Sequence, residues 1–242
     1  MSGVYDAYAS RLGFQNVKLQ INENTERELF ADYREAEEDS EKAKKVLKTI
    51  RRELGAEAYE TICRAAASRN EEKADAIFRT IVLGLHLPKK QQVMNCLTEE
   101  AVCTVAALGK KTWNEAHRFM GFVRFQELSG KILYAEIRPE NDILPLIAPH
   151  FADRFPLENW IIYDEGRKKS IVHGANRGWI LLENRASMEM LGKECSEEED
   201  SYASLWKVFT ESIAIEARKN EKLQKQLLPL KFRDKMTEFK ER

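Results

Sequence analysis

The hydrophobic pattern of this chain changes from helical to strand-like near residue 121, and this change limits the folds that the chain can adopt. Trp113, Ala116 and Met120 recur three and four residues apart, so they share one face of a helix. Gly121 interrupts that spacing, and the next seven residues, FVRFQEL at 122–128, suit a strand better. We therefore expect a helix over 112–120 and a strand that begins directly after Gly121.

A hairpin is expected in the next part of the chain. Ser129-Gly130 is typical of a two-residue turn, and residues 131–138 continue with side chains that alternate between two faces. Further strands are expected at 160–164, 170–173 and 179–183. The pattern predicts an α+β fold in which many helices surround a small, mainly antiparallel β-sheet. We expect a single domain over 1–242, with a mainly helical sublobe at 1–112 and a second sublobe at 113–242.

Helical spacing dominates the rest of the chain. Asp39 or Ser40 suits the N-cap of one helix, and Gly55 suits its end. Asp142 suits the N-cap of another helix, which tolerates Pro145 in its first turn and runs to about Arg154. Residues 17–21 indicate a strand, whereas residues 25–34 fit either a capped helix or a strand. The remaining helices are expected at about 56–67, 70–86, 98–109, 202–218 and 231–240, with a short one before Pro229.

Charge and cysteine content narrow the setting in which the protein works. The chain has 39 lysines and arginines against 40 aspartates and glutamates, so net charge indicates neither nucleic acid nor a membrane. The tail at 218–242 is basic, which fits either phosphate contacts or a solvated helix face. Four cysteines without a C-x-x-C pair indicate a reducing compartment. The N-terminus lacks the pattern of a signal peptide and no segment is apolar enough to span a bilayer, so we expect a cytoplasmic protein.

The motifs of several well-known chemistries are missing from the sequence. There is no glycine-rich phosphate loop, no G-x-S-x-G nucleophile motif and no zinc deaminase pattern. The four histidines, His86, His117, His150 and His173, are widely separated and lack a helical pair such as H-E-x-x-H. We therefore expect neither a metal nor a cofactor.

Polar side chains in apolar surroundings indicate a different chemistry, the binding of anions. Arginine holds phosphate or carboxylate through two parallel hydrogen bonds, and a neighbouring aromatic ring such as Phe125 or Tyr134 can stack on a base. A structural role is the alternative, because Asp164 and Arg167 could pair internally and the phenylalanines could lie in the core. The polar set consists of His117, Arg118, Arg124, His150, Arg154, Asp164, Arg167, Arg218, Asn220 and Gln224.

Three long runs in the second half of the chain carry a family resemblance. They are EAHRFMGFVRFQEL, YAEIRPENDILPLIAPHFADRFPLENWIIYDEGR and LWKVFTESIAIEARKNEKLQKQLLPLKFRDKMTEF. Through them the chain resembles a bacterial family of DNA metabolism or DNA repair proteins over residues 113–242, and more loosely upstream through LFADYREAEEDSEKAKKVLKTI. Members of that family are typically encoded beside a radical SAM protein of DNA modification or repair. Some are fused to a uracil-DNA-glycosylase-like domain.

The resemblance implies an accessory protein that holds DNA for a radical SAM enzyme. An enzyme acting on DNA or a nucleotide, hydrolytic or glycosylase-like, stays open as an alternative, with Asp164 or Glu136 as acid or base and His117 or His150 assisting. A structural protein partner without DNA contact is the third hypothesis. The residues expected to contact nucleic acid are Arg118, Arg124, Phe125, Arg154, Arg167, Arg218, Asn220 and Gln224.

Overall fold

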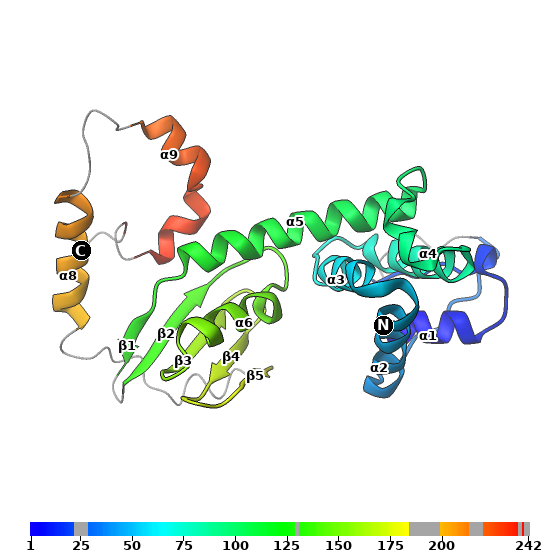
Figure 1. Ribbon diagram of the computed structural model, residues 1–242, viewed down its shortest axis with the longest axis horizontal. Helices are drawn as coiled ribbons and strands as arrows, with labels where there is room; N and C mark the ends of the chain where they lie inside the picture. Colours follow the sequence, from blue (N-terminus) through cyan, green and yellow to red (C-terminus); the bar gives the residue numbers. More distant parts are fainter. Residues whose placement is uncertain (22–28, 129–130, 184–198, 213–219, 237–238, 240–242) are drawn as a thin grey trace. The chain divides into compact units, whose positions relative to one another are not determined.

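A computed structural model describes residues 1–21, 29–128, 131–183, 199–212, 220–236 and 239 of the chain (Figure 1). The chain divides into two compact units, Met1–Asn114 and Glu115–Arg242, and the boundary falls within helix α5 (Glu100–Phe122). The fold class is α+β, as expected from the sequence. Within the described ranges, no helix has the length and apolar character needed to cross a membrane.

The first unit is built from helices that each bury one apolar face. Helix α2 (Ser40–Thr49) begins where the Asp39 carboxylate accepts hydrogen bonds from the backbone N–H groups of Glu41 and Lys42, which confirms the expected N-cap. A π-helical turn (Ile50–Leu54) follows and ends at Gly55, whose φ of 86° suits glycine. The other elements are α1 (Ser2–Ala9), α3 (Gly55–Ala66), α4 (Lys73–His86) and 3-10 helices at Phe14–Asn16 and Lys90–Asn95.

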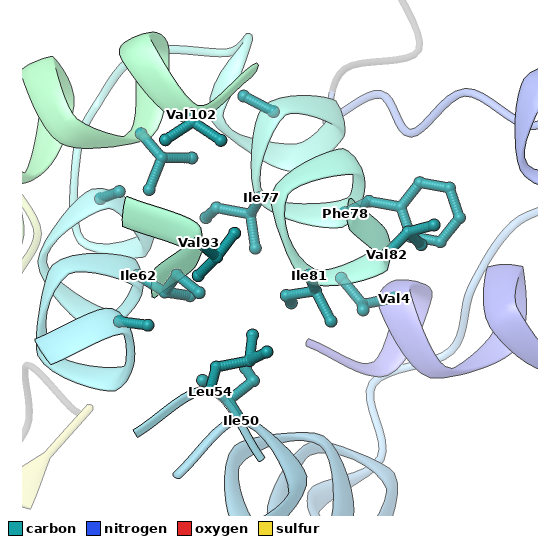
Figure 2. Packing of buried hydrophobic residues seen from close by; sticks show 14 of the residues in the cluster. Val4, Ile50, Leu54, Ile62, Ile77, Phe78, Ile81, Val82, Val93 and Val102 are labelled. Atoms are coloured by element: carbon teal, nitrogen blue, oxygen red, sulfur yellow. The ribbon is translucent and has the colours of Figure 1, made fainter. Parts of the chain in front are cut away.

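The core of this unit lies where its helices converge (Figure 2). Leu54, Ile62 and Phe78 come from three different elements, and each leaves at most 1% of its surface exposed. Gly84 on α4 permits this close packing, because a Cβ at that position would lie 2.7 Å from Leu54 Cδ2. Truncating a fully buried side chain of this size costs about 2–5 kcal/mol, so the cluster is a main source of the unit's stability.

Two expectations for the first unit are wrong. Residues 17–21 form no strand, and the Leu19 N–H instead donates to the Asp75 carboxylate at 3.1 Å. Residues 29–34 form neither a helix nor a strand, and Leu29 and Phe30 are almost fully exposed. Short apolar runs are ambiguous without a partner element to bury them, which is why local patterning failed here. Residues 22–28 lie outside the described part of the chain.

The helices expected at 98–109 and 112–120 are one continuous helix, α5. Gly109 does not interrupt it. A Cβ at Gly109 would lie 2.9 Å from the Thr61 carbonyl oxygen, so this glycine lets the backbones of α3 and α5 approach closely. α5 also continues through Gly121 to Phe122, and the strand expected from residue 122 begins only at Gln126.

A β-sheet organises the second unit, and its described strands lie in the order β1-β2-β3-β4-β5. The pairings are antiparallel except that β2 and β3 run parallel. The crossover that a parallel pair requires is helix α6 (Leu144–Arg154), which packs on β4 and β5 (Figure 1). The strands are β1 (Gln126–Leu128), β2 (Ile132–Ile137), β3 (Asn159–Asp164), β4 (Lys169–His173) and β5 (Trp179–Leu182).

These strands confirm the expected sheet segments to within a few residues. The expected turn residues Ser129 and Gly130 lie outside the described ranges, but Leu128 pairs with Ile132 across them. The expected cap of α6 is wrong. That helix starts at Leu144 without a side-chain cap, and Asp142 instead lies 3.4 Å from Lys169 Nζ.

The described residues that follow the sheet form short helical segments. Phe232 packs against Phe119 and Phe122 of α5, with ring centroids 5.0 and 5.2 Å away. Lys235 forms ion pairs of 3.1 Å with Glu136 and Glu165, so part of the basic tail binds the protein itself. The elements are α8 (Glu199–Ser212), α9 (Glu221–Leu227) and a 3-10 helix at Leu230–Lys235, where an α-helix over 231–240 was expected.

Candidate functional site

The loop between β2 and α6 is held by side chains from two elements. On one side, the buried Glu115 carboxylate of α5 accepts the backbone N–H groups of Glu140 and Asn141, at 2.8 and 3.0 Å, and the Asn141 side-chain amide at 2.6 Å. On the other side, the Arg167 guanidinium donates to the carbonyl oxygens of Pro139, at 3.1 Å, and Glu140. These bonds fix the loop, so much of the motif around it has a structural purpose.

Asp164, a candidate acid or base, lies fully buried at the end of β3. Its Oδ1 accepts the backbone N–H groups of Gly166 and Arg167, and its Oδ2 accepts the Arg167 guanidinium at 3.1 Å. Burial raises the pKa of this carboxyl, and the bonds from Arg167 and Gly166 oppose that shift. Within the described residues neither His117 nor His150 is a hydrogen-bond partner of Asp164. Asp164 and Arg167 thus form the internal pair that the sequence left open as a structural alternative.

The two aromatic side chains expected to stack on bases lie in different surroundings. Phe125 is half-buried, and its ring meets Phe151, Phe155 and Trp160 edge-on at centroid distances of 5.4, 5.6 and 6.4 Å. Tyr134 is only 8% exposed and packs in the cluster of Leu128 and Ile161, where burial raises the pKa of its phenol. Tyr134 therefore has no free face for a base, contrary to expectation.

The other expected site residues are spread over the second unit. His117 and Arg118 are exposed on α5, while His150 is half-buried with its ring 5.1 Å from that of Phe151. Arg154 is exposed, with its guanidinium 5.7 Å from the Phe155 ring centre. Asn220 caps α9 by accepting the Leu223 N–H at 3.0 Å, Gln224 is exposed, and Arg218 lies outside the described ranges. Across the described residues, no cluster of three or more His, Cys, Asp and Glu side chains could hold a metal ion.

An open groove of about 640 Å³ lies between helix α8 and the link from α5 to β1. Its volume falls within the range of about 300–1,000 Å³ that is usual for ligand sites. Three aromatic side chains of α8 line it, and Tyr202, Trp206 and Phe209 expose 63%, 41% and 51% of their surface. Among the residues that the structure describes, the lining is Arg124, Phe125, Glu199, Tyr202, Leu205, Trp206 and Phe209.

Arg124 is the positively charged side chain among the described residues of this groove, and hydrogen bonds hold its guanidinium. One of its guanidinium nitrogens donates to the carbonyl oxygens of Gly121, at 2.9 Å, and Val123, at 3.3 Å. Carbonyls at the C-terminal end of a helix favour such a cation. The guanidinium also lies 6.0 Å from the Trp206 ring centre, within the range of a cation–π contact. Arg124 and Phe125 are therefore the two expected site residues that the structure brings together with α8.

Sequence reasoning missed the aromatic residues of α8. The helical spacing of Tyr202, Trp206 and Phe209 was present in the sequence, but the same spacing is typical of a helix face buried in the core. Leu205 and Val208 share this helical spacing, and each is 62% exposed. Only the tertiary structure shows that nothing in the described chain covers these side chains.

Residues 71–238 match the model of a protein family described as a domain of unknown function, DUF4130. The chain belongs to this family. The match includes every residue that lines the groove, together with Glu115, Asp164 and Arg167. No curated protein and no solved structure matches the chain.

Proposed function

We propose that this protein is a nucleic-acid-binding accessory protein that holds unpaired DNA in the groove beside α8. The observation that carries the proposal is the exposure of Tyr202, Trp206 and Phe209 on the same groove as the Arg124 guanidinium. Stacking of a base on an aromatic side chain contributes about 1–3 kcal/mol, and a duplex does not offer its base faces for it. The groove therefore favours a single strand or an extruded base over a duplex.

Arginine side chains supply the charge that a phosphate backbone requires. Arg124 lines the groove itself, and Arg118 and Arg154 are exposed in the same unit. Contacts of this kind release counterions from DNA, so the affinity is expected to fall steeply as salt concentration rises. Arg167 is not part of this set because its guanidinium holds the 139–140 loop and Asp164.

The proposed partner is a radical SAM enzyme of DNA repair or modification in the cytoplasm. This part of the proposal is supported by the resemblance in the three runs described above. The accessory protein would present a strand to that enzyme, which would perform the chemistry. A hydrolytic role for this chain has less support, because the Asp164 carboxylate already accepts three hydrogen bonds from its own turn and from Arg167.

The test is a fluorescence-anisotropy titration of the full chain against labelled single-stranded and duplex DNA at two salt concentrations, with and without the radical SAM protein. Single-stranded DNA is expected to bind more tightly, and Trp206→Ala is expected to weaken that binding about 5- to 150-fold. Tyr8→Ala, which removes an aromatic side chain 48% exposed in the first unit, is the matched control. Undetectable binding in both settings, or equal effects of the two substitutions, would refute the proposal.

A second candidate function, docking of a protein partner, is favoured by the exposure of Val208 on α8. This side chain is 62% exposed and does not line the groove. If α8 binds the radical SAM protein directly, Val208→Asp should weaken that complex and leave the DNA affinity of the isolated chain unchanged. Loss of both affinities together would indicate damage to α8 rather than a separate docking surface.

A further inference from the structure

Glu199 is the acidic side chain among the described residues that line the groove. It is half-buried, and its Oε2 accepts the backbone N–H of Glu127 in β1 at 2.9 Å. This bond holds the carboxylate in place beside Tyr202, while Arg124 supplies the positive charge of the same groove. A site for the phosphate backbone alone would gain nothing from a fixed negative charge, so Glu199 points to another part of the ligand.

An ionised carboxylate only accepts hydrogen bonds, and its two oxygens together offer about four lone-pair sites. The bond to Glu127 uses one of these sites, and both oxygens keep the capacity to accept from a ligand. The matching ligand edge carries two adjacent N–H donors. Among the common bases, unpaired guanine has such an edge in its N1–H and its exocyclic amino group. Adenine and cytosine place an acceptor nitrogen beside their amino group, and thymine places a carbonyl on each side of its N–H.

We propose that Glu199 makes the groove selective for an unpaired guanine base, with the Watson–Crick edge of the base on the carboxylate and its ring on the aromatic side chains of α8. This inference rests on the proposed function, because it assigns the base preference of the same groove. Bases with free edges are commonly recognised through stacking combined with hydrogen bonds to that edge. Arg124 would then contact the phosphate or the ring rather than the guanine edge, which has donors of its own.

The test uses short single-stranded oligothymidylates that carry one central guanine, adenine or cytosine, or thymine throughout. Anisotropy titrations measure their affinity for the full chain. Guanine is expected to bind about tenfold more tightly than thymine, with adenine and cytosine between them, because a bidentate contact discriminates by about 1–3 kcal/mol. Matched RNA strands and free dGMP as competitor distinguish a guanine in DNA from one in RNA or in a nucleotide.

Glu199→Gln is the decisive variant, because the glutamine oxygen can still accept the Glu127 N–H. The hydrogen bond between α8 and β1 is therefore preserved. The substitution removes the second carboxylate oxygen and should reduce the guanine preference to within about twofold of thymine. Glu127→Gln is the charge-matched control. It removes one negative charge from the residue that is hydrogen-bonded to Glu199 but leaves that backbone N–H in place, and it should preserve the preference.

The outcomes separate this inference from the proposed function. Binding of all four oligonucleotides with equal affinity would overturn the role of Glu199 and leave nucleic-acid binding standing. A guanine preference that survives Glu199→Gln, or that Glu127→Gln removes equally, would also overturn it. In that case Glu199 would only hold the N-terminus of α8 to β1 through its hydrogen bond to Glu127. Absence of binding to every oligonucleotide would refute both proposals together.

Discussion

The buried carboxylate of Glu115 offers the sharpest test of how the second unit is held together. Replacing it by alanine removes the acceptor of three N–H donors, those of the Glu140 and Asn141 backbones and of the Asn141 side chain. Loss of a buried hydrogen-bond partner costs about 1–3 kcal/mol per group, and the Glu140 N–H is near enough to the surface to find water. The two Asn141 groups that stay buried therefore lower the free energy of unfolding of the second unit by roughly 2–6 kcal/mol in Glu115→Ala.

Native-state hydrogen exchange measures this loss in the full chain, because the Ile161 and Ile162 amides lie in β3, in the middle of the sheet of the second unit. Their exchange should accelerate roughly 30- to 20,000-fold in Glu115→Ala. Glu115→Gln keeps one acceptor oxygen, so its exchange rates should lie between those of Glu115→Ala and those of the natural chain. Asn114→Ala, an exposed change one residue earlier on α5, is the control. If the exchange rates rise no more in Glu115→Ala than in this control, the structural role of the carboxylate is refuted.

Four further substitutions test the packing, the loop and a helix cap. Gly84→Ala would place a Cβ 2.7 Å from Leu54 and should destabilise the first unit by about 1–3 kcal/mol. At Gly121 an added Cβ meets nothing within 4 Å, so Gly121→Ala should be neutral or stabilising. Thermal melts in which Gly84→Ala is not the less stable of the two would contradict the packing around Gly84. Arg167→Lys removes guanidinium hydrogen bonds and should destabilise the second unit by about 1–3 kcal/mol in urea titrations. It should leave the DNA affinity of the folded chain unchanged. A reduced DNA affinity at unchanged stability would instead make Arg167 a binding residue. Asp39→Ala should lower the melting temperature near neutral pH. Because N–H groups at the helix start lower the pKa of the Asp39 carboxyl, that deficit should shrink only as the pH falls below about 3.8, and a deficit that does not depend on pH would contradict this cap.

Several motif residues have a structural role in the fold, but the sequence alone could not distinguish that role from a functional one. Asp164 and Arg167 were candidates for chemistry and for phosphate contacts, and the structure joins them to each other and to the 139–140 loop. The choice depends on where Pro139 and Glu140 lie relative to Arg167. That position follows from the chain path through β2, α6 and β3, which local patterning does not encode.

Local signals determined the elements whose residues interact chiefly with their neighbours in the chain. The Asp39 cap, the alternation of β2 and the strands β3 and β4 were predictable, because caps and side-chain alternation act over a few residues. These elements were enough to establish the α+β class, including a mainly antiparallel sheet.

The tertiary structure alone decided where α5 ends and what α8 presents. α5 continues past Gly121 because Phe122 packs on Phe232, a residue far along the chain that no local pattern connects to it. On α8, helical spacing showed that Tyr202 and Trp206 share a face, but spacing says nothing of what covers that face. Burial depends on contacts between distant segments. The sequence by itself therefore determined the fold class and those elements that depend on local signals, and only their packing produced the groove of Arg124, Glu199 and the α8 aromatic residues.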